Sequence, residues 1–263
     1  MDKHFIKQLI YGSGYLSIIF LFLIIFYFIF LKSAPTCFDN KQNQNETEID
    51  CGGVCVPCDL KNALPLENSW IKYFSANNKA VLTAHIKNSN LNYGADSFSY
   101  SFKIYDKNKN EIRTIKKKSF IYNSDVKYLI EITDIDYSII GGVNLIFSDI
   151  IWKTKEELKK PKIIIREKST KASDNGEGVE VSGIIKNDSP FSLSKATLVG
   201  FLNNNNGIKI GASKTELENF NSFGEKFFKI FFPINIKVGS PEDSFFNVNL
   251  ADPNKTEVYI DAR

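Results

Sequence analysis

Four cysteines are the residues of this chain best suited to chemistry, and all of them fall within residues 37–58. They are Cys37, Cys51, Cys55 and Cys58. In an exported segment, an even number of cysteines in a short, loop-rich stretch indicates disulfides, because so small a peptide cannot bury enough apolar surface to order itself. We therefore predict two disulfides. Four cysteines allow three pairings, and their spacing does not choose among them.

Two other chemistries use cysteines at related spacings. Four thiolates can hold a tetrahedral zinc ion, although the Cys51-x3-Cys55 spacing is less regular than in zinc ribbons and an external location favours oxidation. Cys55 and Cys58 also have the Cys-x2-Cys redox spacing. That chemistry needs a helix start after a strand to lower the thiol pKa, and no βαβ pattern surrounds the pair. Zinc and redox chemistry stand as alternatives behind the disulfides.

The loop that the cysteines close also carries four side chains with oxygen atoms. They are Asp39, Asn43, Glu46 and Asp50. Hard oxygen ligands on a disulfide-fixed loop can bind calcium, although the spacing is not that of an EF-hand. We predict no cofactor for this chain apart from calcium as a candidate at this loop, where the alternative is a solvated polar loop.

The whole cysteine segment resembles a small module of exported bacterial proteins with the pattern Cys-x-Asp-x3-Asn-x2-Glu-x3-Asp-Cys-Gly-Gly-x-Cys-x2-Cys. The matching residues are Cys37, Asp39, Asn43, Glu46, Asp50, Cys51, Gly52, Gly53, Cys55 and Cys58. This chain has Asn40 and Asn45 where the module often carries glycine. Asparagine is the non-glycine residue that best tolerates a positive φ, so we expect the turns to survive. The resemblance covers under a tenth of the chain and implies an exported protein, not an activity.

An uncharged, apolar stretch spans residues 9–31. As a helix it would be roughly 35 Å long, enough to cross a hydrocarbon core of about 30 Å, so we predict a transmembrane signal anchor whose partner is the lipid bilayer. Lys3 and Lys7 precede the stretch and one lysine follows it. By the positive-inside rule this bias places residues 1–8 in the cytoplasm and the later domains outside the cell membrane. A cleaved signal peptide and a lipidated Cys37 are weaker alternatives.

Beyond the cysteines, apolar and polar residues alternate with period two. In residues 97–104, Phe98, Tyr100, Phe102 and Ile104 fall on one face and polar residues on the other, which is typical of a half-buried antiparallel strand. The other alternating runs are residues 80–87, 111–121, 126–132, 143–152, 162–167, 178–186, 194–202, 208–215, 226–232, 244–250 and 257–260. Turn residues separate these runs, and no helical period competes with them.

The two halves of this β region echo each other. Ile86-Lys87-Asn88 and Ile185-Lys186-Asn187 each close an alternating run, and their offset of 99 residues is the size of one sandwich domain. A charged stretch ending near Pro161 separates the halves. We predict an all-β fold of two tandem immunoglobulin-like β-sandwiches, residues 66–155 and 161–263.

The first predicted sandwich resembles the FxLYD family of extracytoplasmic β-sandwich modules. The motif residues are Phe102, Ile104, Tyr105 and Asp106, with isoleucine in the place of the leucine. In the second half the same position reads Gly200-Phe201-Leu202-Asn203-Asn204, which lacks the motif. The resemblance implies a fold and a location; it transfers no catalytic residues.

Little else in the chain suggests catalysis or nucleic-acid binding. His85 is the one histidine beyond the apolar stretch, and we expect it to face solvent because it is opposite in phase to Ala84 and Ile86. Neither a Gly-x-Ser-x-Gly elbow nor a phosphate-binding glycine loop is present. The 33 basic and 30 acidic residues give no electrostatic case for nucleic acid. The run Lys116-Lys117-Lys118 fits a protected strand edge, with attraction to an anionic envelope polymer or lipid surface as the alternative.

These observations predict a single-pass, membrane-anchored, extracytoplasmic binding or scaffold protein that is not an enzyme. Its partner would be an extracytoplasmic protein or an envelope polymer, contacted through sandwich edges and end loops. The alternative is an accessory subunit of a cell-envelope machine such as a secretion or pilus complex.

Overall fold

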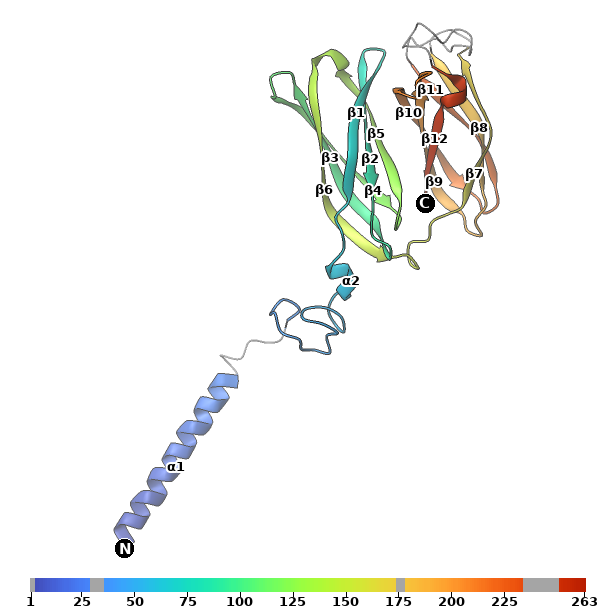
Figure 1. The fold of residues 1–263 in the computed structure, drawn as a ribbon. Coiled ribbons are helices and arrows are strands. Elements are labelled where there is room, and N and C mark those ends of the chain that lie inside the picture. Colours follow the sequence, from blue (N-terminus) through green and yellow to red (C-terminus); the bar gives the residue numbers. More distant parts are fainter. Residues whose placement is uncertain (1–2, 29–35, 174–177, 234–250) are drawn as a thin grey trace. The chain divides into compact units, whose positions relative to one another are not determined.

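The computed structural model describes residues 3–28, 36–173, 178–233 and 251–263 (Figure 1). The chain divides into two compact units, Met1–Asn62 and Ala63–Arg263, and each is described by itself. The first contains the helix α1 (Lys3–Phe26), the cysteine segment and the single-turn helix α2 (Cys58–Lys61). The second contains the strands β1 to β12 and two short 3-10 turns. The predicted all-β fold with one apolar N-terminal helix is confirmed.

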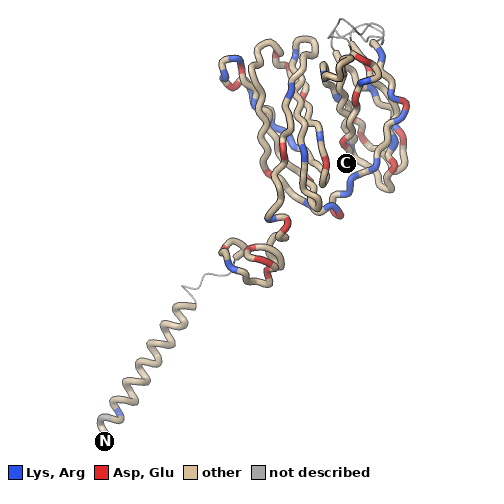
Figure 2. Tube along the Cα trace, viewed as in Figure 1, with Lys and Arg blue, Asp and Glu red and all other residues tan. Residues whose placement is uncertain are grey.

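The helix α1 is a candidate membrane span. Its segment Ile6–Phe26 is 21 residues long, has a mean hydropathy of 2.3 and is not buried in the protein. At 1.5 Å per residue this segment is roughly 32 Å long, close to the thickness of a hydrocarbon core. The hydroxyl of Ser13 donates to the carbonyl of Ile10 (3.0 Å), so the helix itself satisfies this polar group. Figure 2 shows no charged residue in the helix after its first turns.

The first sandwich consists of two three-stranded antiparallel sheets, with strand orders β1-β2-β5 and β4-β3-β6. The strands are β1 (Glu67–Ala76), β2 (Lys79–Lys87), β3 (Tyr93–Asp106), β4 (Glu111–Ile121), β5 (Val126–Asp136) and β6 (Ile140–Thr154), with a 3-10 turn at Tyr137–Ile139. The alternation predicted for β3 is confirmed, because Phe98, Phe102 and Ile104 are fully buried. The strand β4, which carries the three consecutive lysines, lies at a sheet edge.

The second sandwich repeats this architecture strand for strand, with orders β11-β8-β7 and β10-β9-β12. Its strands are β7 (Ile163–Ala172), β8 (Val179–Asn187), β9 (Leu193–Asn203), β10 (Lys209–Phe220), β11 (Glu225–Phe232) and β12 (Glu257–Ala262), with a 3-10 turn at Pro253–Lys255. The strands β7 to β12 occupy the places of β1 to β6 in the same order. The alternating run predicted over residues 244–250 lies outside the described residues.

A buried asparagine fixes the corner where β2 leaves its sheet. Asn88 is fully buried, and its Nδ2 donates to the carbonyls of Tyr93 (2.8 Å) and Tyr122 (2.9 Å). Its Oδ1 accepts from the backbone amide of Asn90 (3.1 Å). One side chain thus satisfies three backbone groups that the corner would otherwise bury without partners.

The second sandwich has the same corner, 99 residues later. Asn187 is fully buried; its Nδ2 donates to the carbonyls of Phe191 (2.8 Å) and Asn221 (3.0 Å), and its Oδ1 accepts from the amide of Ser189 (3.0 Å). The asparagines repeated in the sequence, Asn88 and Asn187, therefore make the same set of hydrogen bonds, and both corners require the side-chain amide.

We predict that Asn88→Asp and Asn187→Asp each lower the free energy of unfolding by about 2 kcal/mol or more, because each change removes two donors from buried carbonyls and adds a second acceptor. The measurement is denaturant unfolding of the full chain in detergent micelles. Asn144→Asp, the same change at an exposed position of β6, is the matched control and should leave the midpoint nearly unchanged. Equal effects at all three positions would contradict the proposed role of the corner amides.

Candidate functional site

The structure joins the cysteines as Cys37–Cys55 and Cys51–Cys58, with Cα–Cα distances of 5.6 and 4.8 Å. The predicted disulfides are thus present, and the structure selects one of the three pairings that spacing left open. Cys55 and Cys58 belong to different bridges, so the Cys-x2-Cys pair does not form a redox disulfide of its own. With all four sulfurs bonded in pairs, none is available as a thiolate for zinc.

Left-handed backbone positions shape this module. Asn40 and Asn45, which replace glycines of the resembled pattern, have φ of 56° and 62°, so the expected turns are present. Gly52 and Gly53 also have positive φ, at 77° and 60°. A Cβ on Gly53 would lie 2.2 Å from the carbonyl oxygen of Asn45, so this glycine is needed for space as well as for conformation.

The carboxylates among the four oxygen-bearing side chains of the module hold its own backbone. The Asp50 carboxylate accepts from the amides of Asp39 and Asn40, with Oδ1 at 3.0 Å from each nitrogen. The Glu46 Oε2 accepts from the amides of Asn43 (3.1 Å) and Asp50 (3.2 Å). Both carboxylates are largely buried, so these bonds replace the water that folding removes. The acidic residues of the pattern thus order a loop that has almost no apolar core.

The remaining two members of the predicted ligand set bond to each other. The Nδ2 of Asn43 donates to the Asp39 Oδ2 (2.9 Å), and this bond is the main cause of a lowered pKa at Asp39. The Oδ1 of Asn43 is buried without a hydrogen-bond partner among the described residues. That oxygen is the atom of the set best placed to gain from a cation, whereas the three carboxylates already accept backbone amides. Calcium binding stays a prediction.

The residues of the FxLYD-like motif serve the fold of the first sandwich. Phe102 and Ile104 lie in its core, and the Asp106 Oδ1 accepts from the amides two and four residues further on, both at 2.8 Å. Asn204, which replaces this aspartate in the second sandwich, makes the same two bonds at 3.0 and 2.9 Å. The second sandwich lacks the residues of the motif at this turn but keeps the hydrogen bonds.

The two sandwiches share an aromatic joint that the sequence analysis did not foresee. The outer face of the sheet β1-β2-β5 contributes Trp70 and Tyr128, and the outer face of β10-β9-β12 contributes Phe201 and Tyr259. The ring centroids of Tyr128 lie 4.2 Å from Tyr259 and 5.0 Å from Phe201, and Trp70 lies 6.2 Å from Phe201. The sequence signal was the position of these four aromatic residues, each opposite in phase to the core residues of its strand.

His85 lies in this joint instead of facing open solvent. Its phase is as predicted, but its ring packs between Trp70 (5.9 Å, nearly parallel) and Tyr128 (4.8 Å), and the side chain is half-buried. Burial lowers the pKa of His85, and the nearby charge of Lys209 adds to the effect. The expectation of a solvent-facing histidine was wrong because the second sandwich covers this sheet face.

Polar contacts close the joint around its aromatic centre. The buried Lys127 pairs with Asp261 (3.1 Å) and lies 3.8 Å from the ring of Phe120. Burial lowers the pKa of Lys127 and raises that of Asp261, since both charges have lost water. The hydroxyl of Tyr122 donates to the carbonyl of Ala262 (2.7 Å). These bonds fasten β12 to the first sandwich.

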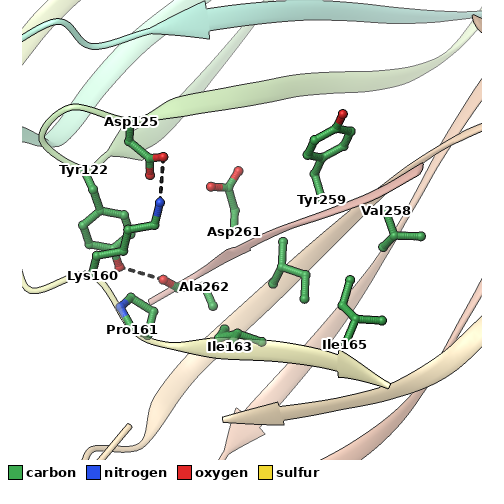
Figure 3. A pocket seen from close by; sticks show the side chains of 11 residues that line it. Tyr122, Asp125, Lys160, Pro161, Ile163, Ile165, Val258, Tyr259, Asp261 and Ala262 are labelled. Atoms are coloured by element: carbon green, nitrogen blue, oxygen red, sulfur yellow. Dashed lines mark hydrogen bonds and ion pairs between the residues drawn. The ribbon is translucent and has the colours of Figure 1, made fainter. Parts of the chain in front are cut away.

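A hollow of about 380 Å³ lies beside these contacts (Figure 3). Its charged side is formed by Asp261 and by the ion pair of Lys160 and Asp125 (2.7 Å). Its apolar side includes Ile163 and Ile165 of β7. Figure 3 shows that the segment carrying Lys160 and Pro161 borders this hollow, so the linker between the sandwiches is part of the joint.

No protein-family model matches the chain, and no curated protein matches it. Among solved structures, a transglutaminase of red sea bream shows some similarity, with 10% sequence identity and a TM-score of 0.19. The similarity covers 73% of this chain and 31% of the transglutaminase chain. A likeness of this size carries no argument about fold or function.

The calcium prediction can be tested by native mass spectrometry of the full chain in detergent, with and without a chelator. A chelator-sensitive gain of one calcium mass that is lost in Asp39→Asn and Asp50→Asn would support it. Asp59→Asn, an acidic change on the neighbouring helix α2, is the matched control. An unchanged mass in calcium buffer would contradict the prediction and leave the three carboxylates with a structural role alone.

We predict that the joint weakens as the pH falls below the ordinary histidine pKa of about 6.5. Because the folded state lowers the pKa of His85, the unfolded state takes up the proton first, and stability that is fully present above this pH is lost as the pH decreases. Denaturant unfolding between pH 8 and pH 5.5 measures the effect. His85→Phe should reduce the slope, His4→Phe should not, and identical slopes in all three proteins would refute this role.

Proposed function

We propose that this chain is a membrane-anchored binding or scaffold protein whose cysteine module and sandwiches face the extracytoplasmic side. The observation that carries the proposal is the union, in one chain, of an exposed apolar helix long enough to span a bilayer and a module closed by two disulfides. Disulfides persist in oxidising compartments and rarely in the cytosol. The order of the two elements therefore favours an anchor followed by an external region.

The polar groups of the joint support a role in binding and positioning. The Glu257 carboxylate accepts from Lys209, Tyr259 and Asn203, each at 2.6 Å. Burial alone would raise the pKa of Glu257, but these three hydrogen bonds outweigh it and lower the pKa. This carboxylate is thus committed to holding β9, β10 and β12 together, as Lys127 and Asp261 are committed to fastening β12.

A joint of this kind suits a scaffold. Domains of one chain move relative to each other by default unless their interface is large and apolar. Here one hydrophobic cluster contains side chains of both sandwiches, including Phe74, Val81 and Ile130 of the first and Val199 and Phe201 of the second. The joint therefore favours a fixed distance between the two outer sheet faces that the described residues leave uncovered, those of β4-β3-β6 and β11-β8-β7.

The alternative, an accessory subunit of a cell-envelope machine, is separated from this proposal by its partners. Gentle solubilisation of the membrane followed by native mass spectrometry should recover the full chain alone or with sub-stoichiometric ligands if it is an independent binding protein. Recovery in a complex of fixed stoichiometry would favour the alternative.

We predict that a cysteine placed at Lys107, an exposed turn residue of the first sandwich, reacts with a membrane-impermeant maleimide on intact cells. The four native cysteines are bonded in pairs, so the new thiol is the reactive one. Lys107→Cys should be labelled before lysis and His4→Cys, at the start of α1, only after it. The reverse pattern would place the sandwiches in the cytoplasm and refute the proposed function.

A further inference from the structure

The uncovered outer face of the sheet β4-β3-β6 combines lysines with a row of serines. Along β3, the residues on this face are Ser97, Ser99, Ser101, Lys103 and Tyr105, opposite in phase to the buried core positions. Across the sheet, Lys118 pairs with Ser99, and Lys116 with Ser101. Same-face neighbours lie roughly 7 Å apart along a strand and about 5 Å apart between strands, so the ammonium and hydroxyl groups form a dense, regular array.

The internal repeat supplies a comparison for this face. The equivalent positions on β9 are Val199 and Phe201, where β3 has Ser101 and Lys103. In the second sandwich these positions are buried in the joint, so that face is covered by protein. In the first sandwich the same positions have become polar and cationic. Figure 1 shows β3 and β6 on the side of the first sandwich that is turned away from the second. The edge strand β4 reaches closer to it, because Lys118 also lines a hollow with Thr197 and Glu216 of the second sandwich.

Protection of a sheet edge does not account for all of these lysines. Lys116 and Lys118 lie on the edge strand β4, where lysine discourages pairing with other strands. Lys103, however, lies on the central strand β3, which is hydrogen-bonded on both sides. Within the described residues, none of these three lysines forms an ion pair within 4 Å. The Asp149 carboxylate, which accepts from Ser99 and Ser148, does feel the charge of Lys118. The protein therefore offsets the charge of this array only in part, at Lys118.

An aromatic ring lies at one end of the array. Tyr105 follows Lys103 on the same face of β3, is half-buried, and pairs across the sheet with Gly142 of β6. The space above Gly142 is open, since a Cβ there would meet no atom within 4 Å. The tyrosine thus offers an apolar ring face with a polar hydroxyl beside unoccupied surface, a combination that suits the ring of a sugar.

We propose that this face binds a linear acidic glycan. Lys103, Lys116 and Lys118 would pair with its repeated anionic groups, the serine row would exchange hydrogen bonds with its hydroxyls, and Tyr105 would stack on a sugar ring. An array on two neighbouring strands matches an extended polymer better than a compact anion, because it has several equivalent charges and no enclosing walls. The inference deepens the proposed function by naming the ligand class, and it rests on the external location of the first sandwich.

The test is binding of fluorescently labelled polygalacturonate oligomers to the full chain in lipid nanodiscs. Lys103→Gln/Lys116→Gln/Lys118→Gln should weaken binding at least tenfold and lower its salt dependence, since three charge contacts are lost. The control Lys79→Gln/Lys155→Gln/Lys159→Gln removes the same charge from exposed positions off this face and should stay within twofold of the unchanged protein. Tyr105→Ser should weaken binding of the glycan and leave binding of polyglutamate unchanged, because polyglutamate has the same carboxylate charge but no sugar ring.

If both triple variants lost the same affinity for the glycan, net charge alone would explain the effect and the proposal would be overturned. Absence of glycan binding to the unchanged protein would also overturn it. If Tyr105→Ser lost as much affinity for polyglutamate as for the glycan, the assignment of a glycan would be overturned. Circular dichroism of each variant separates lost binding from lost folding. Failure here is distinguishable from failure of the proposed function: the maleimide experiment reports location whether or not this face binds a polymer.

Discussion

The burial of β2 on both faces is the constraint on which the β region depends. A three-stranded sheet normally covers a core with one face and leaves the other in water, and β2 instead has Leu82, Ala84 and Ile86 in the first core and Val81 in the joint. Because both faces are covered, β2 has a single compatible register. A slip of one residue would move its core side chains into the joint and its joint side chains into the core. The small sheets gain from each other an interior that neither sandwich could assemble alone.

The two sandwiches solve the same packing problem with different residues. At the core positions of Tyr100 and Glu131, whose side chains form a hydrogen bond of 2.6 Å, the second sandwich has Leu198 and Ile230. At the position of Phe102 it has Gly200, and a Cβ there would lie 2.8 Å from the ring of Phe232, which occupies the space from the facing sheet. Backbone-satisfying groups, such as the corner asparagines and the Asp106 and Asn204 turns, were retained while the apolar contents were exchanged. Hydrogen-bond geometry tolerates less change than the filling of a volume.

Local patterns therefore predicted what local physics determines. Period-two alternation located most strands, the 99-residue echo predicted two equivalent sandwiches, and the asparagines at positive φ followed from their own conformational preference. The strand β1 was missed because Glu67–Ala76 mixes polar and apolar residues on both faces. The disulfide pairing and the place of His85 could not be predicted, since each depends on residues brought together by the tertiary fold. The oxygen ligands proposed for calcium show the same limit: spacing reveals which groups share a loop, not which backbone amides they bond to.

The fastening of β12 also has a consequence in time. The strand β12 is synthesised after all the other described strands. It supplies Tyr259 and Asp261 to a joint whose other half, on β1, β2 and β5, is synthesised far earlier. Until then Tyr128 has no partner from β12, and Lys127 lacks its ion-pair partner Asp261. A nascent chain of this protein thus passes through a stage in which a finished sandwich exposes an aromatic face, the kind of surface that holdase chaperones retain and that crowded nascent chains aggregate through.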